Sequence, residues 1–195
     1  LNGEAPVDLR VNTLLSTRDE ARAALAEDGI AAEPTPLSPN GLRLAGRVAL
    51  STSAAYRDGH VEVQDEASQI AALLVDARPG MAVCDLCAGG GGKTLALAAT
   101  MDMRSGGPGQ LVAADISAKR LDGLRRRLKR SERKTVEFKT LQPKGDPWFD
   151  VNAGAFDRVL VDAPCSGSGA WRRDPDARWR LTPAALVDYA ARQSA

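Results

Sequence analysis

The chain has 195 residues, of which 44% are hydrophobic and 26% charged, and its formal net charge is +1 at pH 7. This composition is typical of a globular protein with one ordinary domain, or one domain and a smaller one. The charge alone predicts no nucleic-acid partner, and no apolar run reaches the roughly 18 residues of a membrane span. We therefore expect no membrane association. Three cysteines are too few for a disulfide framework, so we expect a reducing, cytoplasmic location.

Residues 1–55 predict a small α+β unit. Residues 7–12 alternate in polarity like a strand, and Thr17 with Glu20 fits the capping box of a helix that runs through residue 26. A proline-containing loop follows, and residues 42–44 predict a second short strand. The order is therefore strand, helix, loop and strand.

Residues 56–195 predict a second unit in which helices alternate with strands. Such alternation favours an α/β fold with a parallel, doubly wound sheet, and only four strands are visible in the sequence. We therefore expect the N-terminal part of a Rossmann-like domain. The expected helices cover residues 65–77, the stretch after the glycines at 89–92, and 117–130; the expected strands cover 81–85, 111–115, 135–139 and 156–162.

Four consecutive glycines, Gly89 to Gly92, separate the strand that ends at Asp85 from a helix that begins with Lys93 and Thr94. A glycine loop between a strand and a helix N-terminus is the local geometry that holds a nucleotide-like cofactor. The Gly-Lys-Thr ending resembles a P-loop, but the first glycine of that pattern is replaced by Cys87. A P-loop nucleotide hydrolase is therefore the weaker alternative.

The other candidate ligand is S-adenosylmethionine. Its ribose hydroxyls call for an acid at the end of the second strand, about 20 residues beyond the glycines. Asp115 stands at that place. The competing interpretation of Asp115 is an ordinary acid at a strand end, which caps the helix that follows.

The chain resembles the RsmB/Nop/Sun-type RNA 5-methylcytosine methyltransferases, and within them the bacterial ribosomal small-subunit enzymes. The resemblance rests on four blocks in the family's order, and residues 9–12 also match the family's small RRM-like domain that precedes the catalytic one. The blocks are residues 64–69, 85–94, 115–121 and 162–169, the last followed by the matching residues 171–176 and 178–179. This similarity implies methyl transfer from S-adenosylmethionine to C5 of cytosine in RNA, with ribosomal RNA as the expected partner.

The resemblance also implies roles for single residues. Asp115 would bind the ribose, and Lys93 and Asp162 would lie beside the reacting cytosine. Cys165 would release the methylated product, and Asp162 would contact the cofactor as well. The residues expected to wrap the cofactor are Cys87, Ala88, Gly89, Gly90, Gly91, Gly92 and Lys93.

The sequence departs from the family pattern in two places. Relatives carry the attacking cysteine in a later Thr-Cys-Ser block, and this chain, which opens with Leu1, ends before that block could occur. We therefore expect a fragment that is inactive alone, with a non-catalytic cofactor- and RNA-binding module as the alternative. The acid that relatives place near the adenine is also missing near Leu141, and the nearest acid is Asp146.

Two basic regions are candidates for RNA contact. Trp171, Arg172, Arg173 and the Arg178-Trp179-Arg180 run combine cations with aromatic rings, which suits phosphate contact and base stacking. The alternative for these arginines is ion pairing with Asp174 and Asp176. The helix with Arg120, Arg125–Arg127, Lys129, Arg130, Arg133 and Lys134 is better explained as a solvated face.

The remaining candidates are expected to be structural. Cys84 and Cys87 form a C-x-x-C pair, but the sequence has no second pair and one histidine, so we expect no metal site. Cys84 is expected to be a buried strand residue, and His60 a surface or packing residue.

Overall fold

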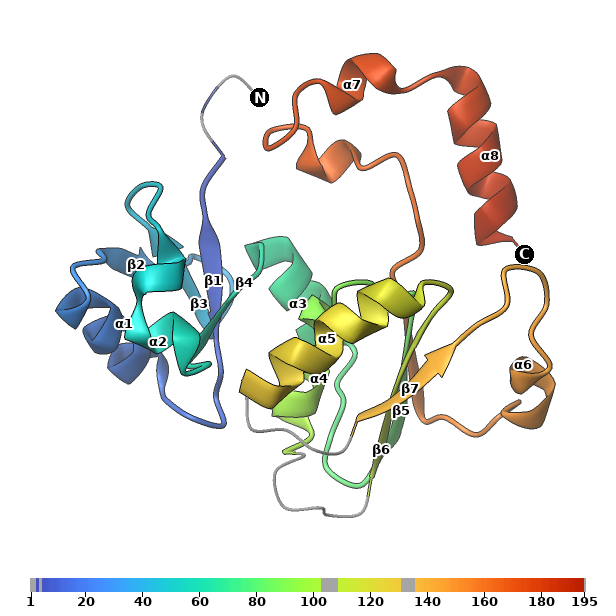
Figure 1. The fold of residues 1–195 in the computed structure, drawn as a ribbon, viewed down its shortest axis with the longest axis horizontal. Coiled ribbons are helices and arrows are strands. Elements are labelled where there is room, and N and C mark those ends of the chain that lie inside the picture. The colour runs from blue at the N-terminus through green and yellow to red at the C-terminus, as the bar shows by residue number, and fades with distance from the viewer. Residues whose placement is uncertain (1–2, 4, 103–108, 131–135, 195) are drawn as a thin grey trace.

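The computed structural model describes residues 3, 5–102, 109–130 and 136–194, and it contains two four-stranded sheets (Figure 1). Arg133, Lys134 and Thr135, which the sequence assigned to a basic turn and a strand start, lie outside the described residues. The side chain of Arg130 lies outside them as well.

The first sheet is antiparallel, with strand order β2-β3-β1-β4. Together with two helices it gives the βαββαβ order of a ferredoxin-like unit. Its elements are β1 (Asp8–Val11), α1 (Arg18–Glu27), β2 (Ala32–Pro34), β3 (Gly41–Leu44), α2 (Ala54–Arg57) and β4 (Val61–Val63), with a 3₁₀ turn at Leu50–Thr52.

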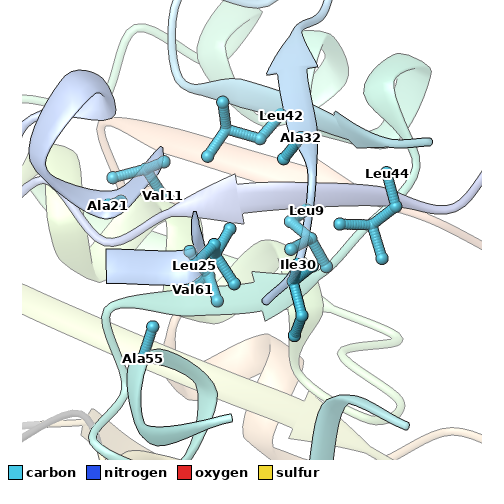
Figure 2. Packing of buried hydrophobic residues seen from close by; sticks show 10 residues of the cluster. All are labelled: Leu9, Val11, Ala21, Leu25, Ile30, Ala32, Leu42, Leu44, Ala55 and Val61. Carbon is cyan, nitrogen blue, oxygen red and sulfur yellow. The ribbon is translucent and has the colours of Figure 1, made fainter. Parts of the chain in front are cut away.

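Helix α1 packs on this sheet through an apolar stripe, and its start is capped as the sequence predicts. The Thr17 side chain accepts a hydrogen bond from the Glu20 amide, and the Glu20 carboxylate accepts one from the Thr17 amide at 2.7 Å. Leu25 on the buried face of α1 meets Leu9 and Val11 of β1, and Figure 2 shows these side chains with Val61 of β4 in one cluster.

The division expected after residue 55 falls inside α2, and the first sheet continues beyond it. Strand β4 pairs antiparallel with β1, with Leu9 opposite Val63 and Val11 opposite Val61. The sheet of the first unit therefore runs to Val63, and all six elements of the βαββαβ order are present. Strands β2 and β4 have three residues each, too few for an alternating pattern to be recognised.

The second sheet is parallel, with strand order β7-β6-β5-β8, as expected for the first strands of a Rossmann-like domain. The chain leaves β5 toward β6 on one side and later returns to place β8 on the other. Its elements are α3 (Glu66–Leu74), β5 (Ala82–Leu86), α4 (Gly92–Thr100), β6 (Gln110–Asp115), α5 (Ala118–Arg130), β7 (Val136–Thr140), α6 (Trp148–Val151) and β8 (Arg158–Val161).

The two faces of the parallel sheet are covered differently. Helices α4 and α5 cover one face, where Leu95 and Leu124 pack against Ala113. On the other face Trp148 and Phe156 pack against a smaller cluster of buried strand residues. Strand β8 is an edge strand of the described sheet, and Val159 and Val161 on it are more than half exposed.

Helix α3 connects the two units, because it contacts both β1 and α4. After β8 the chain forms a 3₁₀ turn at Ser168–Ala170 and the helices α7 (Ala177–Arg180) and α8 (Pro183–Gln193), drawn in red above the sheets in Figure 1. The Gln193 side chain donates to the Pro164 carbonyl at 2.8 Å, so the end of α8 returns to the segment after β8. In the described part of the chain, no helix combines the length and the apolar character that crossing a membrane requires.

The turn from β5 into α4 depends on one glycine. Gly91 has φ = 79° and precedes the first residue of α4, and a Cβ at this position would overlap the Leu124 side chain of α5. Gly90 next to it has no positive φ, and a Cβ there would meet nothing closer than an Arg127 nitrogen at 3.8 Å. Alanine substitutions at these two neighbouring glycines can therefore be compared directly, with Gly90 as the control for Gly91.

We expect Gly91→Ala to lower the free energy of unfolding by about 2–4 kcal/mol, because left-handed strain adds to overpacking against Leu124. Gly90→Ala should change it by less than about 0.5 kcal/mol. Urea unfolding followed by circular dichroism measures both. Equal effects of the two substitutions would contradict this account of the turn.

Candidate functional site

The glycine loop is a tight turn that folds back onto the end of β6. Cys87 and Gly89 have positive φ values of 65° and 56°. The Ala88 amide donates to the Ala114 carbonyl at 2.9 Å, and the Gly89 amide donates to Asp115 Oδ2 at 2.8 Å. The loop is therefore anchored to the neighbouring strand before α4 begins.

Asp115 is buried at the end of β6, and both of its carboxylate oxygens accept backbone hydrogen bonds. Oδ2 accepts from Gly89, and Oδ1 accepts from the Ser117 amide at 2.7 Å, at the start of α5. The structure thus gives Asp115 the strand-end role that the sequence offered as the alternative. Its predicted contact with a ribose stays a prediction.

A pocket of about 320 Å³ opens over the glycine loop, and both units contribute to its wall. It brings together the predicted cofactor residues of the loop with Lys93 and Asp162, while Asp115 is not among its lining residues. The first unit and α3 contribute Val63, Gln64, Asp65 and Ser68, β5 contributes Asp85, and the segment after β8 contributes Arg173.

Lys93 and Asp162, which both line this pocket, form an ion pair. Lys93 Nζ lies 2.6 Å from Asp162 Oδ2, which joins the first turn of α4 to the residue that follows β8. The Lys93 side chain is largely buried, whereas that of Asp162 is more than half exposed. The structure therefore places the two predicted site residues in direct contact.

Asp85, at the end of β5, is a pocket residue to which the sequence analysis gave no role. Its Oδ2 accepts a hydrogen bond from Thr94 Oγ1 at 2.5 Å, and its Oδ1 is buried and finds no hydrogen-bond partner in the described part of the chain. Burial raises the pKa of Asp85 to about 6, against the lowering effect of the Thr94 hydrogen bond. An acid that ends an apolar strand directly before a glycine loop is the signal that identifies it.

Two arginines to which the sequence assigned no role in the site connect the first unit to the pocket and its glycine loop. Arg127 of α5 contacts Glu62 of β4 at 2.9 Å and also donates to the Gly90 carbonyl. Arg10 of β1 donates from Nε to Gln64 Oε1 at 2.6 Å. The sequence assigned Arg127 to a solvated helix face, which is wrong for this residue because its partner is 65 positions away in the chain.

The three cysteines lie in different environments. Burial raises the pKa of Cys84 to about 12, as its position inside β5 implies. Burial and the nearby Asp115 also raise the pKa of Cys87 above its ordinary value. Cys87 is partly buried and lines the pocket, whereas Cys165 is exposed in the segment after β8.

The candidate RNA-contacting residues lie in the segment after β8. Arg173 lies 3.2 Å from Asp65 of the pocket wall, and Arg172 donates to the Gly3 carbonyl at 3.1 Å. Arg178 stacks on the Trp179 ring at 4.5 Å, and Trp171 Nε1 is buried without a hydrogen-bond partner within the described ranges. Arg180 pairs with Asp174 at 2.7 Å, so ion pairing, the alternative interpretation, holds for Arg180.

Asp146, the nearest acid to Leu141, forms hydrogen bonds within its own loop. Its carboxylate accepts from the Gln142 and Trp148 amides at 2.9 Å each and pairs with Lys139. Across the described ranges, no cluster of three or more His, Cys, Asp or Glu side chains is arranged to hold a metal ion.

The burial of Asp85 makes stability depend on pH. Its pKa is higher in the folded chain (about 6) than in the unfolded chain (about 3.9), so the unfolded chain releases this proton first as the pH rises. The contribution of Asp85 to stability is therefore complete below pH 4 and is lost as the pH rises through 6.

We expect the stability of Asp85→Asn relative to the original chain to rise by about 1–3 kcal/mol between pH 4 and pH 7. Urea unfolding at four pH values in this range measures the difference. Asp150→Asn, on the exposed face of α6, controls for the loss of one carboxylate. A difference that stays flat across the range would contradict the assignment.

The comparisons with known proteins cover the whole chain. A family model of the 16S rRNA methyltransferase RsmB/F matches residues 72–195, and one of the ferredoxin-like domain of RsmF/B-like methyltransferases matches residues 1–51. The ribosomal RNA small subunit methyltransferases B of Serratia proteamaculans and Pseudomonas putida are 34% and 37% identical over 99% and 90% of this chain. The chain spans 43% and 39% of their lengths.

Solved structures agree with these sequence comparisons. The crystal structure of PH0851 superposes with a TM-score of 0.88 and 33% identity, over 97% of this chain and 42% of that one. NSun6 from Pyrococcus horikoshii with SFG has a TM-score of 0.71 over 83% of this chain and 63% of that one, and at 18% identity it shows the fold alone. With family models on both units, this chain belongs to the RsmB/F family of 16S rRNA methyltransferases.

Proposed function

We propose that the protein takes part in the transfer of a methyl group from S-adenosylmethionine to C5 of a cytosine in ribosomal RNA. The observation that carries the proposal is the pocket in which two separate sequence motifs meet, the glycine loop and the block that begins with Asp162. The names of the relatives, which are ribosomal RNA small subunit methyltransferases, support the substrate class.

The residues of the pocket fit S-adenosylmethionine. Four glycines let a ligand approach the backbone closely. Asp65, Asp85 and Asp162 outnumber Lys93 and Arg173 in the lining, so the pocket carries excess negative charge that favours a cation. When bound, this cofactor supplies a methyl group that a positively charged sulfonium activates. The loop from Cys87 to Lys93 would hold it, with Asp162 contacting both the cofactor and the cytosine.

Cytosine C5 becomes nucleophilic once a thiolate has added to C6, and the proton on C5 must leave before that thiolate is eliminated. Cys84 and Cys87 are poor candidates for this thiolate, because burial raises the pKa of both. The family resemblance assigns the attack to the cysteine of a Thr-Cys-Ser block, which these 195 residues do not contain. We assign Cys165 to product release, since it is exposed directly after β8. Lys93 and Asp162 would hold the base beside it.

The target base must be unstacked or single-stranded to enter the pocket. We assign the approach of the RNA to Trp171, Arg172, Arg173 and Arg178, where arginines and indole rings lie together after β8. The three free cysteines accord with a reducing compartment, and we place the reaction in the cytoplasm.

Calorimetry on the purified chain tests the choice of cofactor. We expect S-adenosylmethionine and S-adenosylhomocysteine to bind and ATP to leave no measurable heat, because Lys93 is paired with Asp162 instead of facing a phosphate. Binding of ATP without binding of either methionine derivative would overturn the proposal. On the same sample we expect no methyl transfer to RNA, because these 195 residues contain no Thr-Cys-Ser block. Methyl transfer would refute the assignment of the essential nucleophile to that block.

The arginines after β8 should determine the salt dependence of RNA binding. We expect Arg172→Gln with Arg173→Gln to lower the slope of log affinity against log salt by about 1 to 1.5, as two lost phosphate contacts imply. A single-stranded cytosine-containing oligonucleotide, titrated at several salt concentrations, measures the slope. Arg22→Gln with Arg78→Gln removes the same charge from exposed ion pairs elsewhere, and an equal change there would refute the assignment.

A further inference from the structure

Two polar atoms of the pocket wall are buried and have no hydrogen-bond partner among the residues that the structure describes. One is Gln64 Nε2, from the segment between β4 and α3, and the other is Asp85 Oδ1, at the end of β5. Gln64 is 7% exposed and Asp85 is 1% exposed. Buried polar groups are nearly always satisfied, so a donor and an acceptor left open in one pocket indicate a ligand that supplies both partners.

The orientation of the Gln64 amide is fixed by Arg10. Gln64 Oε1 accepts from the Arg10 Nε at 2.6 Å, and Arg10 is itself buried. A flipped amide would place its NH₂ group against a guanidinium, which has donors alone. The NH₂ group therefore stays directed away from Arg10 and lies over Gly92, where Nε2 is 3.6 Å from the point that a Cβ on this glycine would occupy.

Gly92 is the first residue of α4, a helix of nine residues whose N-cap, Gly91, supplies no side-chain hydrogen bond. The first amides of a helix point outward and its N-terminus carries partial positive charge, so this end attracts an anion. Gln64 Nε2 adds a further donor at the same place. Asp85 Oδ1 presents an acceptor with negative charge, which attracts a cationic donor.

We propose that Gln64 and Asp85 recognise the amino-acid end of the cofactor. Gln64 Nε2, with the N-terminus of α4, binds the α-carboxylate, and Asp85 Oδ1 binds the α-ammonium. A zwitterionic amino acid supplies the acceptor and the donor that the two buried atoms lack. The inference rests on the proposed function and extends it, because neither residue belongs to the set that the family resemblance assigns.

The test compares two ligands that differ in the amino-acid end. S-adenosylhomocysteine carries it, whereas 5′-methylthioadenosine lacks it and keeps the adenine, the ribose and the sulfur. Gln64→Glu retains an acceptor for Arg10 and replaces the pocket-facing donor with an acceptor. By calorimetry at pH 7.5, we expect this substitution to lower the affinity for S-adenosylhomocysteine at least tenfold and the affinity for 5′-methylthioadenosine less than twofold. Asp85→Asn should discriminate between the two ligands in the same way.

Gln69→Leu is the control for a purely structural effect. Gln69 is also buried, but both ends of its amide are bonded within the protein, to Ser38, Leu9 and Gln64, and it does not line this pocket. We expect it to change the affinities for both ligands by the same factor. If Gln64→Glu lowered the affinities for both ligands equally, or changed neither, the inference would be overturned and the proposed function would stand. Failure of the unsubstituted chain to bind S-adenosylhomocysteine would overturn the proposed function as well.

Discussion

The hydrogen bond from the Gly89 amide to the Asp115 carboxylate is the constraint on which the site depends. It holds the turn after β5 against the end of β6, so that the backbone can reverse within a few residues and start α4. The reversal also brings α4 against α5, where Gly91 leaves room for Leu124. An acid at a strand end thus organises a loop from the neighbouring strand, and the position of Lys93 follows from that loop.

The second wall of the pocket comes from the ferredoxin-like unit, and charged groups fix it there. Arg127 bridges Glu62 of β4 and the Gly90 carbonyl, so one guanidinium holds the edge of the first sheet against the glycine loop. Burial lowers the pKa of Arg10 to about 10, which leaves it charged at neutral pH while it holds Gln64. The first unit therefore takes part in forming the site.

The sequence predicted what depends on neighbouring residues and missed what depends on distant ones. The capping box of Thr17 and Glu20, the glycine turn and the four parallel strands all follow from local patterns, and the structure confirms them. Strand β4 was missed because it has three residues and gains its stability from pairing with β1. The hydrogen bond between Gln64 and Arg10 joins residues 54 positions apart, so no local sequence pattern predicts it.

The Gly92-Lys93-Thr94 sequence shows how tertiary context decides between two ligands for the same residues. In a P-loop the lysine reaches phosphates and the hydroxyl coordinates a metal ion. Here Thr94 Oγ1 donates to the Asp85 carboxylate and Lys93 Nζ pairs with Asp162, so both groups are already directed at carboxylates. A polyphosphate in this pocket would meet excess negative charge, because Asp65, Asp85 and Asp162 outnumber Lys93 and Arg173 in the lining. A sulfonium cation is favoured by the same excess of negative charge, so this short motif, set among these acids, suits a methyl donor better than a nucleotide phosphate.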